Sequence, residues 1–100
     1  MGRVIEQLAG NGKVFSTGAQ VAEVKYRITV FQKTVSTGRG QEIDGLEEVT
    51  GTIGEISGMS LFEMIDQDDL VLHLSDGRRW EFGVSNLEGD AINRGADGIY

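Results

Sequence analysis

The sequence of 100 residues predicts a small all-β domain with one short helix, built as an antiparallel meander of six or seven strands that forms a closed or partly open barrel. Fifteen glycines are scattered along a chain without proline, which indicates many tight turns and strand bends. Apolar and polar residues alternate with a period of two in the clearest segments. Asp76-Gly77 is a strong short-range signal for a β-hairpin. We expect residues 1–100 to form a single domain, with residues 96–100 frayed.

The first half of the chain carries the longest strand pattern. Residues 3–9 fit either a short strand or a short helix that ends at a Gly10-Asn11-Gly12 turn, and the strand is favoured. In "AEVKYRITVFQK" the apolar residues alternate strictly with polar ones, which predicts a long, bent strand with one buried face. The apolar set is Ala22, Val24, Tyr26, Ile28 and Val30.

A second strand follows in "LEEVTGTIGEI", with Val49, Gly51 and Ile53 on one face. The interior glycines at positions 51 and 54 predict a bulge or a sharp coil. Between the two strands, residues 34–45 are polar and rich in glycine, and we expect a mobile loop there.

A short helix is predicted over residues 60–67, because Ser60-x-x-Glu63 is a capping-box pattern. Leu61, Phe62 and Ile65 fall on one face of this helix, which we expect to cover the open end of a barrel. A turn in "NLEGD" then precedes a last short strand near residues 91–94.

Two registers are open to the hairpin in "LHLSDGRRWEF". A two-residue loop at Asp76-Gly77 divides the apolar side chains between both faces. A three-residue loop with Gly77 left-handed instead places Leu72 opposite Trp80. Burial of three leucines is worth about 1.5 to 3 kcal/mol each, which outweighs turn preference. We therefore predict that one set of side chains faces inward (Leu70, Leu72, Leu74, Trp80, Phe82, Val84) and another faces outward (Val71, His73, Arg79, Glu81).

Composition excludes several classes of chemistry. The absence of cysteine rules out disulfides, thiolate metal sites and a cysteine nucleophile. The net charge of −7 opposes unspecific attachment to nucleic acid or to an anionic membrane. No apolar run is long enough for a signal peptide or a membrane span, so we expect a cytoplasmic protein.

The charge is unevenly distributed along the sequence. Residues 1–40 have six basic and two acidic side chains, a balance of +4, whereas residues 41–100 have three basic and fourteen acidic ones, a balance of −11. We expect strands from the two parts to pair and neutralise each other. A dipolar surface that associates head to tail or receives a basic partner is the alternative.

No motif predicts catalysis, a metal or a cofactor. His73, the only histidine, is placed opposite Arg79 on an outer face, where the positive charge disfavours imidazolium and repels a cation. Residues 66–69, "DQDD", lack the glycine of a calcium-binding loop and fit a solvated turn. Residues 37–41, "TGRGQ", offer backbone amides for an anion, with Arg39 above them, but this signal is weak.

These observations favour a non-enzymatic binding or assembly module for a protein, a second copy of the chain or a small ligand. Four surface residues are the candidates for this role: Arg27, Phe31, Lys33 and Arg39. The alternative is a five-stranded barrel of the oligonucleotide-binding type that stacks single strands on Phe31. The net charge counts against nucleic acid, and an enzyme with a carboxylate pair is the least favoured hypothesis.

Overall fold

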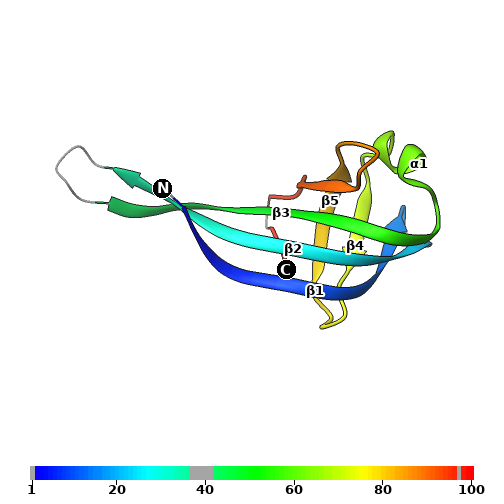
Figure 1. Cartoon of the computed structure of the whole chain (residues 1–100), viewed down its shortest axis with the longest axis horizontal. Helices are drawn as coiled ribbons and strands as arrows, with labels where there is room; N and C mark the ends of the chain where they lie inside the picture. The colour runs from blue at the N-terminus through cyan, green and yellow to red at the C-terminus, as the bar shows by residue number, and fades with distance from the viewer. Residues whose placement is uncertain (1, 37–41, 97) are drawn as a thin grey trace.

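The computed structural model describes residues 2–36, 42–96 and 98–100, with side chains described over 3–32, 47–96 and 98–100. Within these residues, six strands close into an antiparallel barrel in the order β1-β2-β3-β6-β5-β4, with one short helix beside it (Figure 1). The elements are β1 (Gly2–Ser16), β2 (Ala19–Ser36), β3 (Glu42–Gly58), α1 (Leu61–Ile65), β4 (Leu70–His73), β5 (Arg79–Val84) and β6 (Asp90–Asn93).

The barrel consists of two three-stranded meanders, β1-β2-β3 and β4-β5-β6, connected through α1. Their edges meet twice, where β1 pairs with β4 and where β3 pairs with β6. The predicted all-β class, the closed barrel and the single short helix are therefore confirmed. The described strands number six, so the five-stranded alternative does not describe this barrel.

Residues 3–9 belong to a strand, as favoured, but this strand is longer than the short one predicted and passes through Gly10-Asn11-Gly12 without a turn. The strand β1 continues to Ser16 and turns back at Thr17-Gly18, whose φ angles of 50° and 82° fit a two-residue hairpin loop. Gly10 and Gly12 lie inside the strand, opposite Tyr26 and Val24 of β2. A Cβ atom on Gly12 would stand 2.8 Å from Leu72 Cδ1, so glycine makes room for core side chains here.

The alternating burial predicted for β2 and β3 is confirmed by five buried residues of β2 and by Val49 and Ile53 of β3. The predicted bulge is present directly after Gly54, where two residues of β3 stand against one of β2. A Cβ atom on Gly51 would lie 2.7 Å from the Arg27 carbonyl oxygen, so the two strands approach closely at this glycine.

The prediction of a long loop over residues 34–45 is wrong at both ends of the segment. Residues 34–36 of β2 pair with residues 42–44 of β3, so the ladder continues into this segment. The physical reason is that backbone pairing between neighbouring strands does not require an apolar pattern. Residues 37–41, including the expected anion cradle and Arg39, lie outside the described residues.

The three-residue register of the β4–β5 hairpin is confirmed. Leu72 pairs with Trp80 and His73 with Arg79, and Gly77 has a φ of 92°. The Leu74 amide donates to the Arg78 carbonyl oxygen at 2.8 Å, which closes the turn. All six side chains predicted to face inward are at most 5% exposed.

The helix is confirmed, although its predicted apolar face is partly wrong. The Ser60 side chain accepts a hydrogen bond from the Glu63 amide at 3.2 Å, as the capping-box pattern predicts. Met64 is the side chain that reaches the core, whereas Phe62 is 71% exposed. Phe62 and Met64 are two positions apart, about 200° around a helix, so they lie on opposite sides of α1 and only one of them can face the core.

The frayed end expected at residues 96–100 is not what the structure shows. Tyr100 exchanges two backbone hydrogen bonds with Arg79, of 2.6 and 2.9 Å, and Ile99 bridges to Trp80. Ile99 also packs against the core. The end of the chain therefore extends the sheet beside β5, because β5 still has backbone groups to satisfy there.

The barrel interior is filled with side chains. Seven of them are less than 2% exposed: Val14, Ile28, Met64, Leu70, Leu72, Trp80 and Phe82. Beyond the barrel, β2 and β3 continue as a paired two-stranded arm (Figure 1). The Cα extents of 51 × 26 × 23 Å reflect this projection.

Candidate functional site

The four residues predicted as a binding surface lie along β2 and the segment that follows it. Arg27 and Phe31 share the outer face of β2, where Arg27 is exposed and Phe31 is half-buried. Lys33 pairs with Gly2 in the β1–β2 ladder, but its side chain is not among those described. Arg39 lies outside the described residues. The structure thus brings Arg27 and Phe31 onto one face, and the binding role of all four residues stays a prediction.

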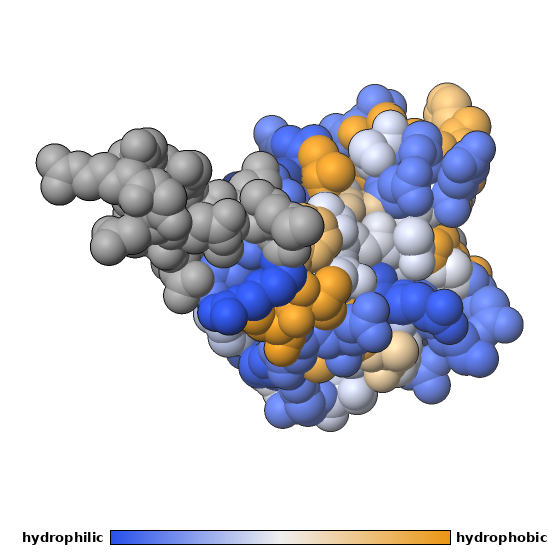
Figure 2. Space-filling view, turned by 60° about the vertical axis from the view of Figure 1, so that its left-hand side comes forward, coloured by the Kyte–Doolittle hydropathy of each residue, from blue (hydrophilic) through white to orange (hydrophobic). Residues whose placement is uncertain are grey.

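Phe31 is part of an apolar surface at the point where the arm leaves the barrel. Val4 lies directly opposite Phe31 in the β1–β2 ladder and is 57% exposed. Ile5 is the extra residue of a bulge between Val4 and Glu6 and is 43% exposed. We call Val4, Ile5 and Phe31 the neck surface. Figure 2 shows hydrophobic surface between hydrophilic patches on this side of the molecule.

The sequence contains a signal for the neck surface that periodicity does not reveal. Val4 and Ile5 are consecutive apolar residues, and in a regular strand one of them faces the core. The bulge at Ile5 and the end of the barrel beside it leave both side chains exposed.

A shallow groove crosses the outer face of β1, β2 and β3. Four of its lining residues carry charge, two of each sign: Lys25, Arg27, Glu55 and Glu88. Lys25 and Glu55 form an ion pair of 2.8 Å, whose hydrogen bond raises the pKa of Lys25. Glu55 has a φ of 46° at the bulge of β3. Because acids and bases alternate here, the groove has no single charge sign with which to attract a polyanion.

One end of the barrel is closed by an ion-pair cluster that sequence reasoning missed. Glu6 occupies the register position opposite the buried Val30, and both of its carboxylate oxygens accept hydrogen bonds of 3.0 Å from Arg78. Arg78 also donates to Asp76 at 2.8 Å. These bonds lower the pKa of Glu6 and of Asp76 and raise the pKa of Arg78. Each charged group of this cluster therefore has its partner within the protein.

Tyr26 and Ser75 close the same end of the barrel from inside. The two hydroxyl oxygens lie 2.9 Å apart, and the Ser75 amide donates to the Tyr26 hydroxyl at 3.1 Å. The opposite end is covered by α1, whose Met64 is fully buried. A filled interior with both ends covered directs any ligand to the outside of the barrel.

A second outer surface lies on β1, β4 and β5. The imidazole of His73 stacks on the ring of Phe15, with centroids 4.0 Å apart and an interplanar angle of 25°. Arg79 lies opposite His73, and Tyr100 is held beside Arg79. Burial, the positive charge of Arg79 and that of Lys13 lower the pKa of His73. As predicted, His73 and Arg79 face outward, but Phe15 as the stacking partner was not foreseen.

The described residues contain no group of three or more histidine or acidic side chains arranged to hold a metal ion. Within "DQDD", both carboxylate oxygens of Asp69 lie 2.9 Å from the Ser16 hydroxyl and share its hydrogen bond, which ties this segment to the end of β1. No described helix has the length and apolar content to cross a membrane.

No protein-family model matches the chain, and neither the curated proteins nor the solved structures contain a significant match. Neither family membership nor structural similarity therefore indicates a function.

Proposed function

We propose that this protein is a non-enzymatic assembly module that associates with a second copy of itself through the neck surface. The observation that carries the proposal is the exposure of Val4 and Ile5, at 57% and 43%, at the base of an arm that extends past the barrel. A two-stranded ribbon is marginally stable alone in water, so contacts with a partner would stabilise the arm. Clustered exposed apolar residues are typical of interaction sites.

The open strand edges are less suited to this contact than the face of the neck. Glu6 occupies an inward register position in β1, and a bulge stands directly before it. Inward-pointing charges and bulges are devices that discourage edge-to-edge pairing of strands. The contact therefore uses side chains of the neck surface rather than an added strand.

Analytical ultracentrifugation of the wild-type chain and of two variants tests this proposal. We expect the wild-type protein to sediment as a dimer at micromolar concentration and Ile5→Asp to sediment as a monomer, because a buried carboxylate opposes association. Leu87→Asp is the matched control, since Leu87 is 61% exposed at a different place and its variant should still dimerise. A wild-type chain that stays monomeric up to about 1 mM would refute self-association.

The second candidate function is binding of single-stranded nucleic acid, because Arg27 and Phe31 share one exposed face with Lys25. Against it, Glu55 pairs with Lys25, and Glu88 lines the same groove. Salt-dependent shifts of the resonances of residues 25–39 upon addition of an oligonucleotide would support this candidate. Unchanged resonances would remove it.

A further inference from the structure

Three nitrogen-bearing side chains stand in one row across the outer face of β1, β4 and β5. Lys13 lies directly opposite His73, and His73 lies directly opposite Arg79. Neighbouring strands are about 4.8 Å apart, so the three positions span about 10 Å. His73, between the two cations, is neutral at pH 7 because its pKa lies below the ordinary value of 6.5. The row therefore holds two positive charges, from Lys13 and Arg79, and an imidazole that can gain a proton when an anion binds beside it.

The acids near this row are directed elsewhere. The two carboxylate oxygens of Asp69 share one hydrogen bond from the Ser16 hydroxyl, and Glu81 lies against the backbone of Gly95. Glu23, across the β1–β2 ladder from Lys13, accepts from Gln20 at 3.4 Å. Within the part of the chain that the structure describes, neither the Lys13 ammonium nor the Arg79 guanidinium has a carboxylate within ion-pair distance.

The row borders a cavity with aromatic walls. Phe15, His73, Arg79 and Tyr100 line this cavity, together with Asp69. The stack of His73 on Phe15 fixes the plane of the imidazole. Two backbone hydrogen bonds between Arg79 and Tyr100 hold the second aromatic residue beside the guanidinium. A flat ring attached to an anion would therefore find both an apolar contact and positive charge.

We propose that this cavity binds a small phosphate-bearing ligand, with the phosphate on Arg79 and His73, Lys13 at the edge, and an apolar part of the ligand against Phe15 and Tyr100. A guanidinium binds phosphate oxygens through two parallel hydrogen bonds, and an imidazolium or an ammonium adds a further donor. The ligand is small and carries one phosphate, because the Asp69 carboxylate in the lining and the net charge of −7 both repel a longer polyanion.

The single histidine provides a direct measurement. Proton NMR of His73 in untagged protein is recorded during titration with phenyl phosphate, with inorganic phosphate as the ring-free probe and sodium chloride keeping the ionic strength constant. We expect saturable shifts of the His73 ring signals, tighter binding of phenyl phosphate than of inorganic phosphate, and a rise in the His73 pKa upon binding. The pKa rises because the bound anion favours imidazolium.

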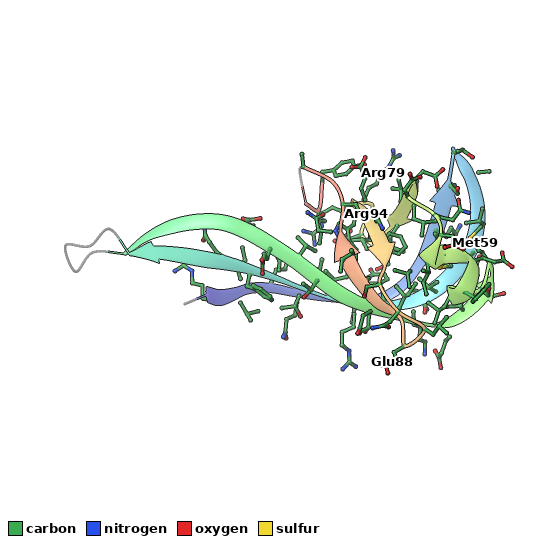
Figure 3. All side chains as sticks on the ribbon, turned by 90° about the horizontal axis from the view of Figure 1, so that it is seen from above. Met59, Arg79, Glu88 and Arg94 are labelled. Carbon is green, nitrogen blue, oxygen red and sulfur yellow. The ribbon has the colours of Figure 1, made fainter. Side chains whose placement is uncertain are left out.

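Two arginine variants separate a site from general attraction. Arg79 and Arg94 both lie toward the side of the barrel opposite Glu88 (Figure 3), but the Arg94 side chain lies over Gly83. We expect Arg79→Gln to weaken phenyl phosphate binding about tenfold, because the glutamine amide can replace only one of the two charge-assisted hydrogen bonds of the guanidinium. Arg94→Gln, which removes the same charge, should leave the affinity unchanged.

Three results would overturn the proposal. The first is the absence of saturable shifts up to about 20 mM phenyl phosphate, because a specific site with a millimolar dissociation constant would be saturated by then. The second is an equal loss of affinity in both arginine variants, and the third is a shift of the His73 signals with a single-stranded oligonucleotide but not with phenyl phosphate. The last result would assign the row to the backbone of a nucleic acid. The wild-type circular dichroism spectrum in each variant confirms that the barrel is intact.

Discussion

The barrel and the neck are built from the same strands but differ in how far they bury the side chains of those strands. Along β2, every second residue from Ala22 to Val30 is at most 5% exposed, because β4, β5 and β6 cover that face. Past Val30 the alternation ends, and both Phe31 and Gln32 are half-buried. The β3–β6 ladder includes Thr50–Thr52 only, so the cover stops there. A period-2 pattern yields a buried face only where a second layer of strands exists.

This difference divides the molecule into a part that stabilises the fold and a part that is open to partners. The interior of the barrel contains the filled core. The neck surface lies beyond the barrel, and the row of Lys13, His73 and Arg79 lies on its outer face. Substitutions inside the barrel should therefore reduce stability, and substitutions outside should change association or ligand binding.

The largest expected effect compares one phenylalanine from each part. Phe82→Ala should lower the free energy of unfolding by about 3 to 5 kcal/mol, because Phe82 is 0% exposed beside Trp80. Phe31→Ala should cost about 1 kcal/mol or less in the monomer, because Phe31 is only half-buried. Urea denaturation monitored by tryptophan fluorescence measures both. Similar losses in the two variants would contradict the division of the molecule into these parts.

A smaller effect is expected at the turn that sets the β4–β5 register. Gly77 has a φ of 92°, and its Cβ position is open, so Gly77→Ala meets backbone strain without a steric clash. We expect a loss of about 1 to 2 kcal/mol. Gly54→Ala is the comparison, since no heavy atom lies within 4 Å of a Cβ there and no left-handed φ is required. Unchanged melting temperature in Gly77→Ala would show that the turn relaxes.

The smallest effect concerns the pH dependence of stability. Burial, then Arg79 and Lys13, lower the pKa of His73 below its ordinary value of 6.5, so the unfolded chain binds the proton more readily than the folded one. Stability therefore falls as the pH drops from 6.5 toward the lowered pKa. We expect His73→Gln to remove this part of the decline between about pH 7 and pH 5. Identical pH profiles for the variant and the wild-type protein would exclude His73 as the cause.

The sequence predicted local features well where one of two alternatives, such as one hairpin register, is much lower in free energy than the other. The β4–β5 register followed from the burial of three leucines, and the cap at Ser60 followed from the capping-box pattern. The same reasoning failed at Gly10-Asn11-Gly12, where glycine marks space required by Tyr26 and Leu72 rather than a turn.

The candidate surfaces were less predictable than the fold. Arg27 and Phe31 share a face, as their spacing in a strand requires, but Phe31 was expected to act with basic residues and instead lies opposite Val4. That pairing depends on the bulge at Ile5, where no glycine marks the extra residue as Gly54 does in β3.

By itself, the sequence determined the period of each strand, the three-residue turn at Gly77 and the short helix, because these depend on residues close together in the chain. Only the tertiary structure decided which distant segments became neighbours. It brought Arg78 into an ion pair with Glu6 and paired the backbone of Tyr100 with Arg79 of β5. It also aligned Lys13 with His73 and Arg79. The physical reason is that barrel closure sets these contacts through the register of whole strands, which single residues do not encode.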